Sequence, residues 1–318
     1  MKAGAQTTLR NQAAVSGIGI HSGAPATLTI LPAEANTGIV FVRLGRSGEP
    51  DREIRADVRS VTATEFATVL GDANGPLCST AEHVLAALAG LGVDNAIIEI
   101  DGPEVPIMDG SAEPFVVAIE QAGITQLAAA RRFIKVLKTV RVARNEAYGE
   151  LRPNAQGFRV DVDIEFDHPL IGRQSCRLDV DPASFRREVA RARTFGFMRD
   201  VAKLWNAGHA LGASFENTLV VTENRILNPD GLRFADEFVR HKALDAIGDL
   251  ALAGAPLLGT YRSVRGGHNL NHAVLSALMA DRSAWTVVEA ETAPRRTIRG
   301  HADVATGLAA PAYGPEVS

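Results

Sequence analysis

The stretch Phe238-Val-Arg-His-Lys-Ala-Leu-Asp-Ala-Ile-Gly-Asp-Leu250 combines an apolar helix with three groups that can bind metal or transfer protons. His241, Asp245 and Asp249 recur every four residues, and positions four apart lie on one face of a helix. Packing alone does not require two acids and a histidine inside an apolar run. Such groups must be paired, metal-bound or shifted in pKa to be buried. We interpret them as part of a catalytic zinc site.

Strands precede helices in each half of the chain, and this order predicts an α+β fold. In the first half, residues 26–31 and 38–44 have the alternating, β-branched character of strands. Residues 79–89 and 112–121 have the pattern of helices closed by glycine. Further strands are expected at 95–100, 133–142, 150–152, 158–166, 175–180 and 284–290, and further helices at 182–190, 198–207, 235–253 and 270–279.

The repeated order of elements indicates two similar two-layer domains, each a sheet packed against helices. Residues 1–127 would form the first domain and residues 128–295 the second, with a linker at 127–132. Residues 296–318 are rich in Pro, Gly and Ala, and we expect a flexible tail there. No residue-level repeat accompanies the duplication, which therefore depends on the order of elements alone.

The composition excludes several classes of protein. With 318 residues, 46% of them hydrophobic and 22% charged, the chain resembles an ordinary soluble globular protein. A net charge of -4 leaves no basic excess for binding nucleic acid. We find neither a signal peptide nor an apolar run long enough for a transmembrane segment. Cys78 and Cys176 form no CxxC motif, so we expect a reducing, cytoplasmic setting. We also expect a monomer.

Glu82 and His83 lie in the stretch Ser79-Thr-Ala-Glu-His-Val. One interpretation is structural: Ser79 and Glu82 would form a capping box, and His83 would be an ordinary side chain of the first helical turn. In the functional interpretation, His83 binds zinc and Glu82 is a general base. Adjacent residues on a helix point about 100° apart, so one side chain can bind the ion while its neighbour addresses a water molecule.

His83, His241 and Asp245 together would supply three ligands and leave one coordination position open, as catalytic zinc requires. The alternative is a buried salt bridge between His241 and either Asp245 or Glu237. Two histidines and one aspartate also suit Fe²⁺. We therefore expect one catalytic Zn²⁺, with Fe²⁺ as the alternative metal.

His268 follows a glycine pair in a predicted loop. A loop histidine is usually only solvated, but Asp249 lies on the preceding helix as a possible partner. A carboxylate that keeps an imidazole protonated makes a competent general acid. Lys242 is either a surface lysine or a cation that neutralises a phosphate or a developing oxyanion.

Residues 191–204 contain candidate substrate contacts. Thr194 is a cap or turn hydroxyl in the structural interpretation, and Phe195 is more typical of a core than of a substrate contact. An apolar stripe at helical spacing follows, and it indicates either ordinary packing or the wall of a channel for an alkyl chain. The stripe consists of Met198, Val201 and Leu204.

The glycine-rich stretch Gly17-Ile-Gly-Ile-His21-Ser-Gly23 resembles a phosphate loop only superficially. It lacks the Gly-Lys-Ser/Thr ending, and its glycines have the wrong spacing for a dinucleotide-binding motif. We therefore reject an NTPase or Rossmann assignment. The glycines instead indicate tight backbone turns.

Six motifs occur in a fixed order along the chain, at residues 17–23, 79–84, 106–112, 193–200, 236–249 and 266–271. Together they resemble the UDP-3-O-acyl-N-acetylglucosamine deacetylase family, the zinc amidases of lipid A biosynthesis. The resemblance extends from about residue 7 to residue 290. It implies an active site between the two domains, and an insert in the second domain that walls a passage for an acyl chain. The implied reaction removes the N-acetyl group from a UDP-linked acylated amino sugar, which yields acetate and UDP-3-O-acyl-glucosamine.

By motif position, the resemblance also implies roles for individual residues. Zinc would bind His83, His241 and Asp245, with Glu82 as base, His268 as acid, Asp249 as its orienting partner, Thr194 at the oxyanion and Lys242 near phosphate or developing charge. Substrate contacts would come from Phe195, Phe166, His21, Arg265, Met198, Val201 and Leu204. Relatives often have Lys where Arg265 stands. The guanidinium keeps the charge but presents a planar fork, so phosphate contacts would differ in detail.

Two other functions stay open at this point. A zinc hydrolase for a different amide or ester would share the chemical half of the site, but would lack the nucleotide pocket and the acyl passage. A catalytically silent metal-binding or lipid-sensing protein would need no base and acid such as Glu82 and His268. A measurement of acetate release separates these functions from the deacetylase.

Overall fold

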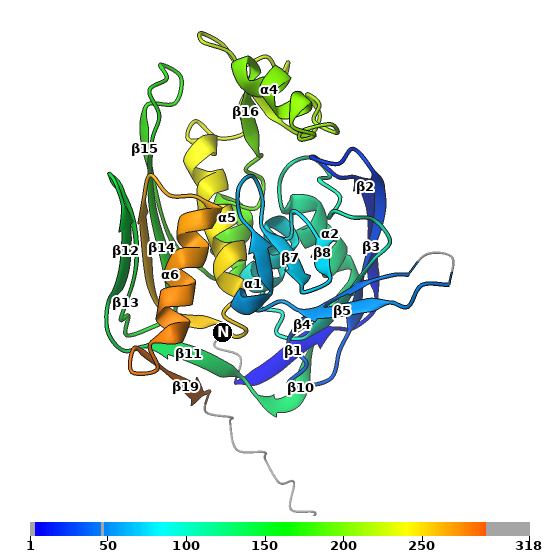
Figure 1. The fold of residues 1–318 in the computed structure, drawn as a ribbon. Coiled ribbons are helices and arrows are strands. Elements are labelled where there is room, and N and C mark those ends of the chain that lie inside the picture. The colour runs from blue at the N-terminus through cyan, green and yellow to red at the C-terminus, as the bar shows by residue number, and fades with distance from the viewer. Residues whose placement is uncertain (1–3, 46–47, 291–318) are drawn as a thin grey trace, which may run out of the picture.

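The computed structural model describes residues 4–45 and 48–290, which form an α+β fold. The fold class predicted from the sequence is confirmed. Helices lie between two larger sheets, one from each half of the chain (Figure 1). Over these two ranges, no helix is both long and apolar enough to cross a membrane. The tail predicted at 296–318 lies outside the described residues.

The first half contains a five-stranded sheet of order β2-β3-β9-β4-β5. Its strands are β2 (Ala13–Ile18), β3 (Pro25–Pro32), β9 (Ala96–Ile100), β4 (Ile39–Arg43) and β5 (Arg52–Arg55). Strand β3 buries every second side chain, as its alternating sequence predicts. A short 3-10 helix, η1 (Val58–Ser60), leads to a three-stranded sheet of β6 (Val61–Ala63), β7 (Val69–Asp72) and β8 (Gly75–Cys78). Helices α1 (Glu82–Leu91) and α2 (Glu113–Ala122) follow the predicted pattern closely.

The second half contains a seven-stranded sheet in which β18 is central, pairing with β13, β11 and β14. Its strands are β11 (Arg132–Val136), β12 (Val140–Arg144), β13 (Ala147–Arg152), β14 (Phe158–Glu165), β15 (Arg173–Asp179), β18 (Leu257–Val264) and β19 (Trp285–Glu289). The longer helices of this half are α3 (Pro182–Glu188), α5 (Glu237–Ala251) and α6 (His268–Ala280). Asp181 caps α3, because its side chain accepts hydrogen bonds from the first-turn amides.

The segment predicted as a linker at 127–132 is mostly a strand instead. Strand β10 (Ile124–Ala130) pairs antiparallel with β1 (Ala5–Leu9). The run of alanines that suggested a linker is therefore held by backbone hydrogen bonds, which the sequence does not reveal. The predicted boundary between residues 127 and 128 falls inside β10, and the division into two domains stays a prediction.

Residues 195–221 contain a small two-stranded sheet and two short helical segments. Strand β16 (Phe195–Phe197) pairs parallel with β17 (Leu219–Val221). Between them lie the 3-10 helix η2 (Met198–Asp200) and helix α4 (Val201–Asn206), which stand apart from the two sheets (Figure 1). The predicted helix at 198–207 is therefore divided into two short helical segments.

Helices α1 and α5 cross in close contact at the centre of the molecule (Figure 1). Gly248 of α5 makes this approach possible. A Cβ atom at Gly248 would lie 2.0 Å from the backbone carbonyl oxygen of Glu82. That oxygen belongs to the first residue of α1 and cannot rotate away. The glycine therefore brings together the two helices that carry the candidate metal ligands.

We expect Gly248→Ala to destabilise the protein by about 1–3 kcal/mol, the usual cost of forcing extra volume into a packed interior. This overpacking opposes and exceeds the gain of about 1 kcal/mol that alanine normally brings to a helix. Thermal and urea unfolding would measure the change. Gly196→Ala is the matched control, because a Cβ there meets nothing within 4 Å. Equal stability of the two variants would contradict the close approach.

Candidate active site

Glu82 and His83 begin helix α1, and both side chains are buried. The capping-box interpretation is wrong, because the N-cap residue is Ala81 and no side chain caps the helix. The Glu82 carboxylate points elsewhere: its Oε2 accepts a hydrogen bond of 3.0 Å from the backbone N–H of Thr68. Glu82 is therefore free of a capping role, and its other oxygen faces the centre of the site.

His83, His241 and Asp245 meet at one point between α1 and α5. Ligand atoms of the three residues all lie within 4.8 Å of one another. The Oδ1 atom of Asp245 lies 3.2 Å from Nε2 of His241 and 3.6 Å from Nε2 of His83. This oxygen is buried and has no hydrogen-bond partner among the residues that the structure describes. A buried carboxylate oxygen that faces two imidazole nitrogens is suited to share a cation with them.

The protonation states suit metal binding. Nδ1 of His241 lies 3.0 Å from the carbonyl oxygen of Ala192. A carbonyl can only accept, so Nδ1 carries the proton and Nε2 keeps its lone pair for the cluster. Burial lowers the pKa of His241 to about 4, against the attraction of Asp245.

Asp245 remains ionised in this setting. Burial alone would raise the pKa of its carboxyl group, but the charge of Lys242 and the polar groups around the carboxylate outweigh burial and hold the pKa well below the ordinary value. Nζ of Lys242 donates a hydrogen bond of 3.0 Å to Oδ2 of Asp245. The same carboxylate raises the pKa of Lys242 against the effect of burial. Oδ2 is thus held by the lysine, while Oδ1 stays free.

His268 is the first residue of α6 and not a loop residue as predicted. Its Nδ1 lies 2.9 Å from Oδ2 of Asp249. Two further donors hold this carboxylate: Asn271 Nδ2 at 2.8 Å and Thr68 Oγ1 at 2.5 Å. The other ring nitrogen of His268, Nε2, lies 3.8 Å from Oε1 of Glu82. The imidazole therefore has a fixed orientation, with its free edge toward Glu82.

The surroundings raise the pKa values of both His268 and Glu82. Burial alone would lower the pKa of His268, but the charges of Asp249, Glu82 and Asp245 raise it to about 9. Burial raises the pKa of Glu82, which makes its carboxylate a stronger base than an exposed glutamate. One group is a protonated acid at neutral pH and the other is a basic carboxylate. Pairs of this kind are typical of acid–base catalysis.

A pocket of about 410 Å³ opens beside the cluster and reaches His268. It is lined by Thr64, Glu65, Phe66, Arg144, Ala147, Lys242, Arg265, Gly266, Gly267, His268, Asn269 and Leu270. Three of these side chains, Arg144, Lys242 and Arg265, are cations. Arg265 also pairs with Glu146, and with Glu165 at 2.7 Å. The pocket is thus a basic cavity next to the acid and base.

The aromatic residues predicted to contact substrate lie near this site. The ring of Phe195 is 5.0 Å from that of Phe238 and 5.8 Å from that of Phe166. Nζ of Lys242 lies 5.7 Å from the centre of the Phe195 ring. His21 packs 6.1 Å from Phe66, which lines the basic pocket.

Two predicted residues, Thr194 and Met198, lie outside the hydrogen-bond network of the cluster over residues 4–45 and 48–290. Thr194 is held through its backbone, which donates to the Gly110 carbonyl and accepts from Leu219 N, each at 2.8 Å. Among the described residues, no hydrogen bond joins its hydroxyl to the three ligands. Met198 is 51% exposed, so the apolar stripe predicted around it is not packed into the core.

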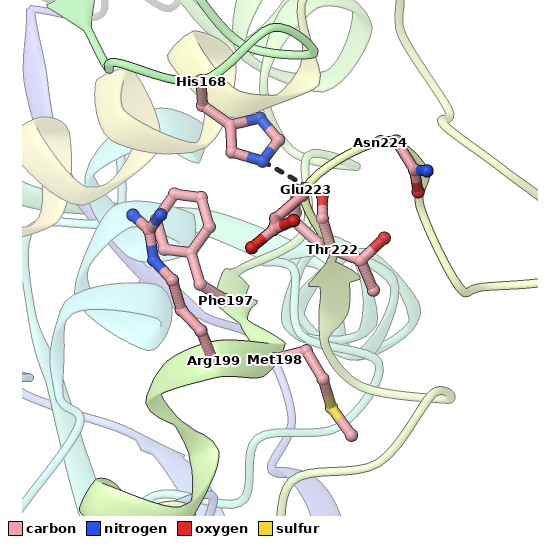
Figure 2. A pocket seen from close by; sticks show the side chains of 8 residues that line it. His168, Phe197, Met198, Arg199, Thr222, Glu223 and Asn224 are labelled. Carbon is pink, nitrogen blue, oxygen red and sulfur yellow. Dashed lines mark hydrogen bonds between the residues drawn. The ribbon is translucent and has the colours of Figure 1, made fainter.

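A second cavity, of about 280 Å³, is lined in part by residues of β16 and β17 (Figure 2). It is lined by His168, Phe197, Met198, Arg199, Val221, Thr222, Glu223 and Asn224. Figure 2 shows the ring of His168 directed at the chain near Thr222, whose carbonyl oxygen lies 3.0 Å from Nε2. Of the predicted stripe, Met198 lines this cavity, and Val201 and Leu204 do not.

Comparison with known proteins identifies the family. The model of the UDP-3-O-acyl N-acetylglycosamine deacetylase (LpxC) family matches residues 6–280. This chain belongs to that family. Proteins named UDP-3-O-acyl-N-acetylglucosamine deacetylase from Brucella melitensis biotype 2, Brucella ovis and Brucella abortus are each 50% identical to it over 286 residues. Each match covers 90% of this chain and 99% of the relative.

Three residues that hold the side chains of this site were not predicted from the sequence. Thr68 contacts both Glu82 and Asp249, and Asn271 holds Asp249 from α6. The carbonyl of Ala192 fixes His241. Thr68 and Ala192 act through single long-range contacts that leave no local pattern. Asn271 stands one helical turn after His268, and that spacing was the only available signal.

Proposed function

We propose that this protein is a zinc-dependent deacetylase that removes the N-acetyl group from UDP-3-O-acyl-N-acetylglucosamine, an early step of lipid A biosynthesis. The observation that carries the proposal is the buried junction of His83, His241 and Asp245 beside Glu82 and His268. The relatives named for this activity support the choice of substrate. Release of acetate and formation of the free 2-amino sugar follow from the reaction.

The donor set fits zinc. Two imidazole nitrogens and one carboxylate oxygen, the last without a hydrogen-bond partner, make three ligands and leave room for a fourth. Fe²⁺ suits the same donors. When bound, the metal would supply Lewis-acid activation of water and of the amide carbonyl. The residues His83, His241 and Asp245 would hold it.

The protein's own groups would move the protons. Glu82 would accept a proton from the attacking water, because its carboxylate is buried and basic. His268, oriented by Asp249, would donate a proton to the leaving amine. The hydroxyl of Thr194 would contact the developing oxyanion once substrate is bound. The attack of water on the amide and the departure of the amine would thereby be assisted by two different side chains.

The basic pocket would bind the nucleotide end of the substrate. Arg144, Lys242 and Arg265 give it the positive charge that a diphosphate requires. Phe166 and Phe195 would border the uracil and the sugar, and His21 would lie at the edge of the same region. We propose that the acyl chain runs along Met198, Val201 and Leu204. The two cysteines are unpaired and buried, which supports our proposal of a reducing, cytoplasmic setting.

Asp249→Asn should move the alkaline limb of the pH profile to lower pH. The protonated form of His268 is the active acid, so activity is lost as pH rises through its pKa. That pKa is raised to about 9, partly by the charge of Asp249. Removal of the charge lowers the pKa, and the loss of activity then begins at lower pH. A profile of kcat/KM against pH measures the shift, and an unmoved alkaline limb would contradict the pairing.

The proposal is tested by metal analysis combined with acetate release from UDP-3-O-acyl-N-acetylglucosamine. We expect about one zinc or iron per chain, in line with a single three-ligand site. Metal without acetate release would favour a silent metal-binding protein. Release of acetate from simple amides at the same rate would favour a different zinc hydrolase.

A further inference from the structure

Glu104 is a buried carboxylate that the proposed chemistry does not use. Its side chain is 1% exposed and accepts four hydrogen bonds. The donors are His21 N at 3.0 Å, Ser22 N at 2.8 Å, Ser22 Oγ at 2.7 Å and Thr80 Oγ1 at 2.7 Å. Three of these donors belong to the glycine-rich turn after β2, and one lies just before α1. Glu104 therefore joins two segments that are distant in sequence.

The glycine-rich turn is shaped around this carboxylate. A Cβ atom at Gly19 would lie 2.2 Å from Oε2 of Glu104 and 2.4 Å from Oγ of Ser22. Only glycine leaves room for the carboxylate at this position. The glycine-rich stretch at residues 17–23 therefore binds the carboxylate of Glu104 from the same chain.

Thr80, the partner on the other side, has a strained backbone. Its φ angle is 59°, which is a true outlier for a β-branched residue. Such strain persists only where the surroundings hold it in place. The hydroxyl is tied to Glu104, and the preceding residue, Ser79, exchanges backbone hydrogen bonds with Pro103 and Val105. The turn next to Glu104 thus fixes the conformation of Thr80.

This conformation decides where α1 begins. Ala81 follows Thr80 as the N-cap residue, and no side chain caps the helix. The direction of its first turn therefore depends on the backbone that enters it. Glu82 and His83 stand in that first turn. A change of φ at Thr80 would therefore change the direction of this turn and shift both side chains relative to the Asp245 carboxylate.

We propose that Glu104 is a positioning residue for the deacetylation. Through Thr80 it orients the base Glu82 and the ligand His83. Through the amide of His21 it positions an edge of the substrate pocket. This role rests on the function proposed above. It predicts two separable effects, because the Thr80 contact acts on kcat and zinc affinity, whereas the His21 contact acts on KM.

Two substitutions of Thr80 form a matched pair. Thr80→Val removes the hydroxyl but keeps the β-branched strain, so the turn should relax and kcat should fall about 5- to 100-fold. Thr80→Gly removes the same hydrogen bond, but glycine accepts a positive φ without strain. We expect its kcat to stay within about threefold of the wild type. A steady-state assay of acetate release measures kcat of both variants, and competition with a chelator measures their affinity for zinc.

Glu104→Gln tests the carboxylate itself. Each oxygen of Glu104 faces a backbone N–H, so an amide nitrogen in either orientation meets a donor. We expect a lower kcat and a higher KM, each by about tenfold for one misplaced buried polar contact. Adding Thr80→Gly should restore kcat and zinc affinity but leave KM high. A general loss of stability would not recover in this selective way, and thermal unfolding of each variant monitors it.

Equal effects of Thr80→Val and Thr80→Gly would overturn the proposal, and so would a double variant no better than Glu104→Gln. If Thr80→Val does not fold, kcat and zinc affinity of Glu104→Gln and of the double variant still test whether Glu104 acts through Thr80. If the wild-type protein released no acetate, the proposed function would fail. Zinc affinity across the same variants would then still show whether Glu104 positions His83.

Discussion

Replacement of Glu82 by glutamine should lower the rate of acetate release by about 100- to 10,000-fold, the range that general-base catalysis provides. Glutamine keeps the carbonyl oxygen that accepts from Thr68 N but cannot take a proton. The loss should appear in kcat, because the base acts in the transition state and the substrate pocket is untouched. Zinc content should stay at the wild-type level, since Glu82 is not among the three ligands.

The measurement is a steady-state assay of acetate release, together with metal analysis and thermal unfolding of the same preparation. Glu99→Gln in strand β9 is a suitable control, because it makes the same chemical change away from the cluster. Near-normal turnover of Glu82→Gln would remove Glu82 from the role of base. A zinc-free variant would instead place Glu82 among the ligands.

Replacement of His268 by alanine is expected to have an effect of similar size, about 100-fold or more on kcat. The imidazole is the only proposed donor for the leaving amine, and its pKa of about 9 keeps it protonated at neutral pH. Its Nδ1 is bound to Asp249, which lies outside the three-ligand set. Zinc content should therefore be unchanged.

Metal analysis distinguishes the acid role from a ligand role. If His268→Ala were isolated without zinc, His268 would be a ligand. Added imidazole offers a second check, since a small diffusible acid should restore part of the rate when the missing group is an acid. The variant Asn269→Ala changes a neighbouring pocket residue and serves as a control for disturbance of the helix start.

The sequence predicted the helix that carries His241, Asp245 and Asp249 because periodicity is a local property. Polar groups in register inside an apolar run have few explanations, so the stripe on α5 was informative by itself. Local patterns also located Glu82 and His83 at the start of a helix. What joined the two helices was the ligand count that a catalytic metal requires, and the family resemblance supported this grouping, since spacing alone does not reveal which distant segments meet.

The errors have physical causes. Ser79 and Glu82 fit a capping box by spacing, but the positive φ of Thr80 turns the chain so that Ala81 becomes the N-cap. His268 was predicted in a loop because two glycines precede it, whereas α6 begins at that residue. The role of Thr68 could not be predicted, because its hydrogen bond to Asp249 depends on the complete fold.

The close crossing of α1 and α5 has a consequence beyond chemistry. His83 and His241 belong to opposite halves of the chain, so an ion bound by both would cross-link two segments that a very long loop separates. An ion that binds only the folded chain stabilises it by an amount that grows with the logarithm of the free ion concentration. A cell short of the metal would then hold an enzyme that is easier for proteases to open, so that metal supply governs its lifetime as well as its turnover.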